Sequence, residues 1–274
     1  MDHTAPRETP ATAPALPPTL SARLHGLHWH RNLVGEAGAM VYRLGGTGTP
    51  DLYLKRGTGA SHDDVVDEFA RLHWLRGTGC VPRVLHFEAD AAGAWLLSEA
   101  LPGRTAYQWL QDAPAQAQAQ RIAQALAEFL RRFHATPIDT CPFDATHPLR
   151  LAAAQRRLQA GLVDTEDFNE ARAGWSAEAV WQAMTALLPL ASERVLCHGD
   201  YSLDNILLDA PDHVVGVIDL GRAGVADPYQ DLAILASCLD EFDPALADRF
   251  FAAYGIATPD LTRLQFHQLL DEFF

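Results

Sequence analysis

The sequence predicts an α+β protein with two lobes, a small β-rich lobe over residues 22–99 and a larger, mainly helical lobe over residues 100–274. Short segments of alternating apolar and polar residues surround one helical segment in the first part, whereas Ala-, Leu- and Gln-rich helical segments dominate the second. The Leu-Pro-Gly sequence at 101–103 interrupts both patterns. We expect residues 1–21, rich in Pro, Ala and Thr, to be a disordered tail.

One helix of the first lobe and a neighbouring strand carry opposite charges. Strands are expected at 51–55, 84–88 and 94–98. A helix is expected from Ser61, as its N-cap, to about Arg76. Glu68 falls on the apolar stripe of this helix, where a carboxylate is costly unless it is paired. Lys55, which shares a strand face with Tyr53, is the natural partner of Glu68; the alternative is a surface Glu on an irregular helix.

The second lobe is expected to be helical except for one β-rich insert at 195–219. Helices are expected at 115–134, 149–161 and 176–188. Thr258 as N-cap and Pro259 at the first position indicate a last helix. Asp271 and Glu272 would crowd its C-terminus, where the helix dipole disfavours anions. A bound polyamine would neutralise them, and a solvated tail is the alternative.

The insert carries the most informative pattern of the sequence. Asp200 ends a His-Gly-Asp sequence, Asn205 follows five residues later, and Asp219 begins an Asp-x-Gly sequence. This order and spacing match the catalytic loop and the metal-binding Asp of kinases. Asp200 would accept a proton from a hydroxyl nucleophile or orient it, and Asn205 and Asp219 would offer Mg²⁺ the hard oxygen ligands that it prefers. The alternative is a turn with two strand-capping residues.

A hairpin would bring the two expected magnesium ligands together. It would consist of two apolar segments, 206–209 and 214–218. If Asp209 pairs with Val214, Asn205 lies opposite Ile218, the chain neighbour of Asp219. In the first lobe, a turn at 35–40 would place backbone amides over phosphates, or be an ordinary hairpin turn. The backbone at 95–100 would bind an adenine edge, or be a plain linker.

The composition excludes several classes of protein. The 274 residues include 21 Lys and Arg against 35 Asp and Glu, a formal net charge of −14, so a general nucleic-acid binder is not expected. No segment approaches the roughly 18–20 apolar residues of a membrane helix, and the N-terminus lacks the plan of a signal peptide. The four widely spaced cysteines indicate reduced thiols. We therefore expect a protein of the bacterial cytoplasm, a monomer or weak dimer, without nucleic-acid or membrane partners.

With these motifs in place, the chain resembles the aminoglycoside 3′-phosphotransferases, antibiotic-resistance kinases with a protein-kinase-like fold. The resemblance runs from about Leu24 to Phe274. The His-Gly-Asp and Asn pattern indicates only the wider superfamily of small-molecule kinases, and AGLVD at 160–164 and LLDEFF at 269–274 narrow it to this branch. The other matching segments are LYLK at 52–55, DEFARLHWL at 67–75, WLLSEALPG at 95–103, CPFD at 141–144, CHGDYSLDNILL at 197–208 and IDLGRAGVAD at 218–227.

The resemblance implies that ATP, with Mg²⁺, donates its γ-phosphoryl group to the 3′-hydroxyl group of a kanamycin- or neomycin-type antibiotic. It implies that Asp200 is catalytic, that Asn205 and Asp219 bind the metal, and that Asp231 braces the catalytic loop. The residues implied for ATP are Lys55 and Glu68 as an ion pair at the phosphates, Tyr53 stacked on adenine, and the Ser98 and Ala100 backbones at the adenine edge. The residues implied for the antibiotic are Asp167, Glu170, Glu241, Asp271, Glu272 and the terminal carboxylate of Phe274.

Two positions depart from the family pattern and leave the acceptor open. Asn169 stands where an acidic residue is expected, and Ser237-Cys238 stands where Arg-Asp is expected. A weaker attraction for amino groups would follow, so a related kinase acting on another amino-sugar or amino alcohol is the alternative.

Two other classes are disfavoured by particular residues. A non-catalytic pseudokinase would lack at least one of four residues that this chain retains, namely Lys55, Asp200, Asn205 and Asp219. A metal hydrolase would need clustered ligands, and the spacing of the twelve histidines indicates no such cluster.

Overall fold

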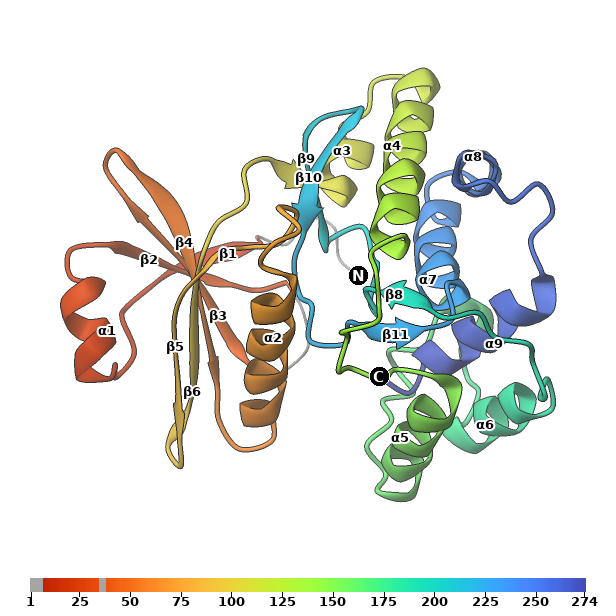
Figure 1. Cartoon of the computed structure of the whole chain (residues 1–274), viewed down its shortest axis with the longest axis horizontal. Helices are drawn as coiled ribbons and strands as arrows, with labels where there is room; N and C mark the ends of the chain where they lie inside the picture. The colour runs from red at the N-terminus through yellow and green to blue at the C-terminus, as the bar shows by residue number, and fades with distance from the viewer. Residues whose placement is uncertain (1–6, 35–37) are drawn as a thin grey trace. The chain divides into compact units, whose positions relative to one another are not determined.

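The chain divides into two units, Met1–Leu101 and Pro102–Phe274, in a computed structural model that describes residues 7–34 and 38–274 (Figure 1). Unit 1 is built on an antiparallel sheet and unit 2 is mainly helical, so the predicted α+β fold class is confirmed. The boundary lies two residues beyond the one expected from the sequence.

Unit 1 contains a six-stranded antiparallel sheet with the strand order β1-β2-β3-β4-β6-β5. Its strands are β1 (Glu8–Ala11), β2 (His28–Asn32), β3 (Met40–Gly46), β4 (Thr49–Gly57), β5 (Val84–Asp90) and β6 (Gly93–Glu99). Helix α1 (Pro18–Arg23) contributes Leu20 to a core that includes Trp29, Leu44 and Leu54 of the sheet. The opposite face of the sheet carries Tyr53 and Lys55, because successive residues of a strand alternate between faces, and helix α2 contacts the sheet at β4 and β6.

The expectation of a disordered tail is wrong for the described part of it, residues 7–21. Strand β1 pairs antiparallel with β2, from Glu8 opposite Asn32 to Ala11 opposite Trp29. Pro10 is compatible with this strand because β1 is at the sheet edge, where a missing N–H costs little. Composition suggested disorder, but pairing with β2 and burial of Leu20 order the segment.

Helix α2 (Ser61–Leu75) confirms the predicted apolar stripe but not the predicted cap. Ser61 is the first helical residue and Ala60 occupies the N-cap position. The Ser61 Oγ instead accepts a hydrogen bond from the Thr58 N–H, at 3.1 Å, in the preceding turn. Glu68 is buried in the same stripe as Val65, Leu72 and Leu75.

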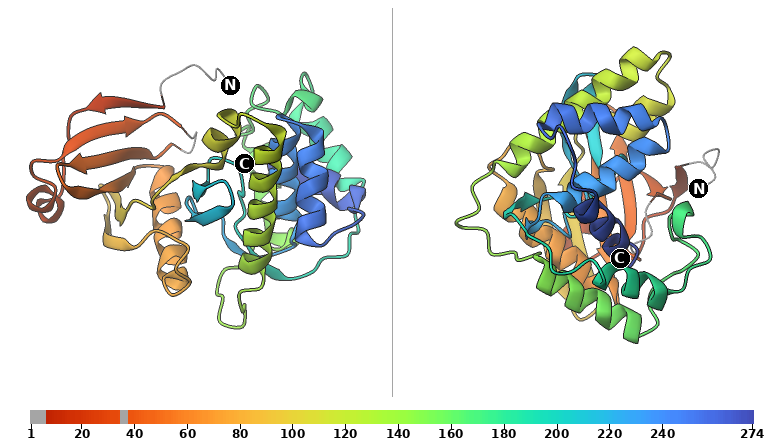
Figure 2. Two further views of the ribbon diagram at one scale, coloured as in Figure 1. Left: turned by 90° about the horizontal axis from the view of Figure 1, so that it is seen from above. Right: turned by 90° about the vertical axis from the view of Figure 1, so that its right-hand side faces the viewer.

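Unit 2 is a set of packed helices with two small sheets, and Figure 2 shows α4, α7, α8 and α9 grouped together. The helices are α3 (Ala106–Gln111), α4 (Gln116–His134), α5 (His147–Gln159), the 3₁₀ helix η1 (Glu170–Arg172), α6 (Ala177–Thr185), α7 (Tyr229–Asp240), α8 (Pro244–Tyr254) and α9 (Leu261–Asp271). The strands are β7 (Arg104–Thr105), β8 (Val195–Cys197), β9 (Ile206–Ala210), β10 (His213–Val217) and β11 (Gly224–Ala226), in the orders β10-β9-β7 and β11-β8. None of the helices within the described ranges has the length and apolar character needed to cross a membrane.

The last helix starts later than the sequence predicted. Asp260, not Thr258, is the N-cap of α9, and its carboxylate accepts hydrogen bonds from the N–H groups of Thr262 and Arg263. The carboxylate of Asp260, directly after Pro259, is a better cap here because it satisfies two of the unpaired amides at the helix start. Asp271 therefore ends the helix and Glu272 is its C-cap.

Candidate active site

A buried carboxylate holds the loop that carries Asp200. Asp231 of α7 accepts hydrogen bonds from the backbone N–H groups of His198 and Gly199, at 2.7 and 2.8 Å. Its side chain is fully buried, and His134 Nε2 lies 3.0 Å from its Oδ2. Asp231 thus braces this loop in the way that the family resemblance implied.

Gly199 and His198 tie the same loop to the segment after β10. Gly199 has a φ of 89°, and a Cβ at this position would lie 2.4 Å from the Arg222 carbonyl oxygen, so the close approach requires glycine. His198 Nε2 lies 2.9 Å from the Ile218 carbonyl oxygen, and its Nδ1 accepts a hydrogen bond from the Asp200 N–H. These partners place a ring proton on Nε2 and make Nδ1 the acceptor.

Asn205 contacts Asp200 directly. Its Nδ2 donates to the carbonyl oxygen and to Oδ2 of Asp200, at 3.0 and 3.1 Å. The Ile218 N–H donates to the Asn205 carbonyl oxygen at 2.9 Å, which confirms the predicted opposition of these two residues. Because the amide nitrogen faces Asp200, the amide oxygen is the atom that can bind a cation.

Asp219 follows in a strained conformation. Its φ of 60° is the one positive value recorded for a residue other than glycine in the described part of the chain. Such strain is costly for a residue with a side chain and is concentrated at functional sites. An amide oxygen and a half-buried carboxylate at the open end of one hairpin are a donor set that fits a hard cation such as Mg²⁺.

The hairpin differs from the prediction at its turn. A two-residue turn at 211–212 replaces the expected four-residue turn, and Val214 pairs with Leu208 rather than with Asp209. Two register shifts along β10 then bring Val217 opposite Ile206. The predicted register was wrong near the turn and right at the open end, because irregular pairing cannot be read from apolar alternation.

The expected ion pair of unit 1 is present. Lys55 Nζ of β4 lies 2.7 Å from Glu68 Oε2 of α2, and the two side chains are 20% and 8% exposed. A partner of opposite charge offsets the cost of burying the Glu68 carboxylate. The pair also fixes the position of an ammonium group, which is a suitable donor to phosphate oxygens.

Tyr53 lies on the face of the sheet opposite the Leu20 core, in register with Arg43 of β3 and Ser98 of β6. Arg43 forms ion pairs with Glu8 and Asp51, both at 2.8 Å. Burial raises the pKa of Tyr53, and the charge of Glu8 adds to the shift, so the phenol stays neutral. A neutral ring on this face is consistent with stacking on a base.

The backbone at the end of β6 differs from the expectation. The Ala100 N–H donates to the Asp51 carbonyl oxygen at 3.0 Å, which extends the pairing of β4 and β6 by one residue. An adenine contact through this N–H requires the bond to open. Half of the expected phosphate-covering turn at 35–40, residues 35–37, lies outside the described ranges.

Asp271 and Phe274 share a charged region of unit 2 with Asp200. Burial, and then the negative charge of Asp200, raise the pKa of Asp271 to about 6 against the opposing charges of Arg222 and Arg150. Arg222 Nη2 donates to the Phe274 carbonyl oxygen at 2.7 Å. The sequence analysis did not identify Arg150 or Arg222 as site residues, since neither belongs to a motif whose spacing indicates a functional site.

The remaining residues expected at the acceptor site fall into two groups. Asp167, Glu170 and Glu241 are exposed and accessible to a ligand. Glu272 is instead engaged by the protein: it forms an ion pair with Arg172, and the Asn169 N–H donates to its Oε2 at 3.2 Å. An amino group that binds Glu272 would have to compete with Arg172.

Ser237 and Cys238 place neutral groups beside these acids. Burial raises the pKa of Cys238 to about 12, and the charge of Glu241 adds to the shift, so the thiol is neutral at pH 7. The Ser237 Oγ accepts a hydrogen bond from Gln268 Nε2 at 2.9 Å. The departure from the expected Arg-Asp sequence therefore removes one charge of each sign from this part of α7.

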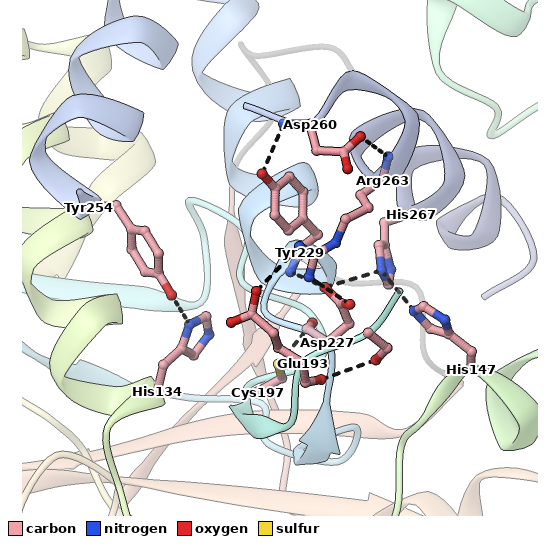
Figure 3. Close-up of polar contacts among 11 residues, drawn as sticks. His134, His147, Glu193, Cys197, Asp227, Tyr229, Tyr254, Asp260, Arg263 and His267 are labelled. Atoms are coloured by element: carbon pink, nitrogen blue, oxygen red, sulfur yellow. Dashed lines mark hydrogen bonds and ion pairs between the residues drawn. The ribbon is translucent and has the colours of Figure 1, made fainter. Parts of the chain in front are cut away.

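Two groups of side chains in the described part of unit 2 have metal-ligating atoms close together, which sequence spacing did not indicate. They are His134, Cys197 and Asp231, and His147, Asp227 and His267. In the first group, Asp231 is the brace described above, and His134 also bonds to the Tyr254 hydroxyl, at 2.7 Å (Figure 3).

The second group joins α5, α9 and the segment after β11 (Figure 3). His147 Nε2 and His267 Nε2 lie 3.2 Å apart. Arg263 Nη2 donates to both carboxylate oxygens of Asp227, at 2.7 and 2.8 Å, and the Tyr229 N–H donates to one of them. The expectation of no ligand cluster was therefore wrong for the described residues, because these groups come together only in the fold. Since Arg263 already neutralises Asp227, we interpret the second group as structural.

The chain matches proteins of known family along nearly its whole length. The model of the phosphotransferase enzyme family matches residues 30–267. An aminoglycoside 3′-phosphotransferase of Escherichia coli is 48% identical over 269 residues, 98% of each chain. The crystal structure of a type VIII aminoglycoside 3′-phosphotransferase is 36% identical, with a TM-score of 0.80 over 93% of this chain and 97% of that one. A Streptomyces rimosus aminoglycoside phosphotransferase in complex with ADP and streptomycin is 28% identical, with a TM-score of 0.74 over 88% of this chain and 94% of that one.

Proposed function

Because this chain belongs to the phosphotransferase enzyme family, in the branch of the aminoglycoside 3′-phosphotransferases, we propose that it phosphorylates the 3′-hydroxyl group of a kanamycin- or neomycin-type antibiotic and so confers resistance. The observation that carries the proposal is the contact of Asn205 with the Asp200 carboxylate, on a loop held by Asp231. We further propose that the enzyme acts in the bacterial cytoplasm, in keeping with the wide spacing of its four cysteines along the sequence.

We propose that Asp200 receives the proton of the attacking hydroxyl group. Its carboxylate is oriented by the Asn205 amide, and its loop by Asp231, so it needs little rearrangement during the reaction. Asn205 and Asp219 would hold Mg²⁺, which neutralises charge on the phosphoryl group when bound. Lys55, held by Glu68, would bind phosphate oxygens of ATP. Most of the rate acceleration would come from positioning and charge neutralisation, as is usual in phosphoryl transfer.

The acceptor residues support a polycationic substrate. Asp271, Asp167, Glu170 and Glu241 offer carboxylates in unit 2, and much of the net charge of −14 remains elsewhere on the surface. Carboxylates attract the amino groups of an aminoglycoside over distances up to about a Debye length, roughly 10 Å at moderate salt.

The proposal is tested by measuring ATP consumption with kanamycin, neomycin and an aminoglycoside that lacks the 3′-hydroxyl group. We expect turnover of the first two and none of the third. Turnover of the third would contradict the 3′ assignment. Inert kanamycin and neomycin, with turnover of another amino-sugar or amino alcohol, would favour the alternative acceptor that Ser237 and Cys238 leave open. Asp200→Ala should abolish turnover while ADP binding survives.

A further inference from the structure

Each of the last three residues of the sequence contacts an arginine from another segment of unit 2. These contacts are Arg172 with the Glu272 carboxylate, Arg157 with the Phe273 carbonyl oxygen and Arg222 with the Phe274 carbonyl oxygen. Residues 272–274 directly follow α9, which ends at Asp271. The position of this segment therefore depends on side chains that are 50 or more residues away in the sequence.

Arg150 makes a different kind of contact with this segment. Its guanidinium carbon lies 3.9 Å from the centroid of the Phe274 ring, so the flat group covers one face of the ring. Arg150 comes from α5 and is only 9% exposed. Its Nε has no hydrogen-bond partner among the described residues. Burying a cation with an unsatisfied hydrogen-bond donor costs folding free energy, so we look for a functional reason for this arginine.

The charge of Arg150 also acts on Asp271. Four charged side chains influence this carboxyl group: Asp200 and Glu272 raise its pKa, and Arg222 and Arg150 lower it. Burial, and then the positive charge of Arg222, lower the pKa of Arg150 itself to about 10, so Arg150 remains a cation at neutral pH. One buried side chain thus contacts Phe274 and favours the ionised form of Asp271.

We propose that Arg150 is a positioning residue for the antibiotic, because its guanidinium group holds the Phe274 ring and lies close enough to Asp271 to act on its charge. It does not contact the substrate. It arranges two residues that we expect to bind amino groups before the antibiotic arrives, which lowers the cost of binding. The inference rests on the proposed function.

The first test compares steady-state kinetics of Arg150→Met, Arg150→Lys and the wild type, with the aminoglycoside that the wild type phosphorylates. We expect Arg150→Met to raise the KM for the antibiotic about tenfold while the KM for ATP changes less than about twofold. Arg150→Lys keeps the charge and loses the flat face, so its KM should be intermediate. Arg156→Met, an exposed arginine of the same helix, is the matched control and should leave both KM values unchanged.

A double-mutant cycle tests whether Arg150 acts through the ring. We expect Phe274→Leu to raise the KM for the antibiotic. The KM of the double variant Arg150→Met/Phe274→Leu should not exceed that of the single variant with the higher KM, since the effects of coupled residues are not additive. Thermal unfolding and ADP affinity show whether a variant is folded. If Arg150→Met fails to fold, Arg150→Lys combined with Phe274→Leu completes the same cycle.

The pH dependence separates positioning from a purely structural role. Loss of the Arg150 charge removes one of the two cations that oppose the raised pKa of Asp271. In Arg150→Met, the pH below which antibiotic affinity falls should therefore move upward, and in Arg150→Lys it should stay in place. Unchanged antibiotic KM in Arg150→Met, or fully additive effects in the cycle, would overturn the inference. A wild type inert toward every aminoglycoside would overturn the proposed function instead.

Discussion

The side-chain amide of Asn205 donates two hydrogen bonds to Asp200, one to its carbonyl oxygen and one to its carboxylate. The two residues are five positions apart, and the loop between them is closed further by the hydrogen bond from the Asn205 N–H to the Ser202 carbonyl oxygen. One side chain therefore orients the Asp200 carboxylate with its nitrogen and keeps its oxygen available for the proposed metal ion.

Asn205→Ala should remove both effects. We expect kcat to fall about 10²-fold, in the range of a lost electrostatic contact at an active site, and the Mg²⁺ concentration for half-maximal rate to rise. Steady-state kinetics at varied Mg²⁺ measures both. Asp212→Ala, in the exposed turn of the same hairpin, is the control. Unchanged Mg²⁺ dependence in Asn205→Ala would rule out its role as a ligand.

Lys55→Met should weaken ATP binding and destabilise unit 1 for separate reasons. Loss of the ammonium group removes a donor to phosphate, so the KM for ATP should rise about tenfold. It also leaves the Glu68 carboxylate buried without its partner, at a cost of about 2 kcal/mol. The double variant Lys55→Met/Glu68→Gln should recover the stability but not the KM. Recovery of both would show that the pair is only structural.

Asp231→Asn should unfold at a lower temperature than the wild type. An amide in place of the carboxylate turns an NH₂ group toward the backbone donors of His198 and Gly199, or leaves one of them unpaired. We expect a loss of about 3 kcal/mol together with a reduced kcat, because the Asp200 loop loses its brace. Asp248→Asn on the surface of α8 is the control for thermal unfolding.

Stability should fall as the pH drops below about 6.5, in part because of His267. Burial lowers the pKa of His267 well below its ordinary value, with His147, Arg150 and Arg263 adding to the shift. The folded protein thus keeps His267 neutral while the unfolded chain takes up a proton near pH 6.5, so stability is complete above that pH and is lost below it, by up to about 1.4 kcal/mol per pH unit for each such histidine.

His267→Phe should make this dependence shallower between pH 5 and 6.5. Urea unfolding of the variant and of the wild type at several pH values measures the difference in slope. The control is His25→Phe, since His25 is exposed. Equal slopes for His267→Phe and the wild type would show that His267 does not carry the effect.

Local patterns were sufficient for much of the site. The Lys55–Glu68 pair follows from strand alternation and helix periodicity, each of which is set by residues a few positions apart. The pairing of Asn205 with Ile218 follows from hairpin geometry. The irregular pairing nearer the turn could not be predicted in this way. The fold class follows from the same kinds of local signal.

Long-range contacts account for what the sequence did not show. Arg150, Arg157 and Arg222 hold residues 273–274 across 50 or more positions, and nothing in their spacing marks them. Glu272 was predicted as a ligand for the antibiotic because of its place in a motif, and only the structure shows that Arg172 already pairs with it. Likewise, the Ala100 N–H is used by a neighbouring strand.

The pairing of β1 with β2 bears on how this protein is prepared for experiments. A chain that begins at residue 22 would lack Glu8, a partner of Arg43, and would have β2 as the edge strand of the sheet. An exposed edge strand presents unpaired backbone N–H and C=O groups to other copies of the protein, which promotes aggregation. Strand β1, within the segment that composition marks as dispensable, therefore keeps the sheet from pairing with other copies, and residues 8–21 belong in any recombinant form.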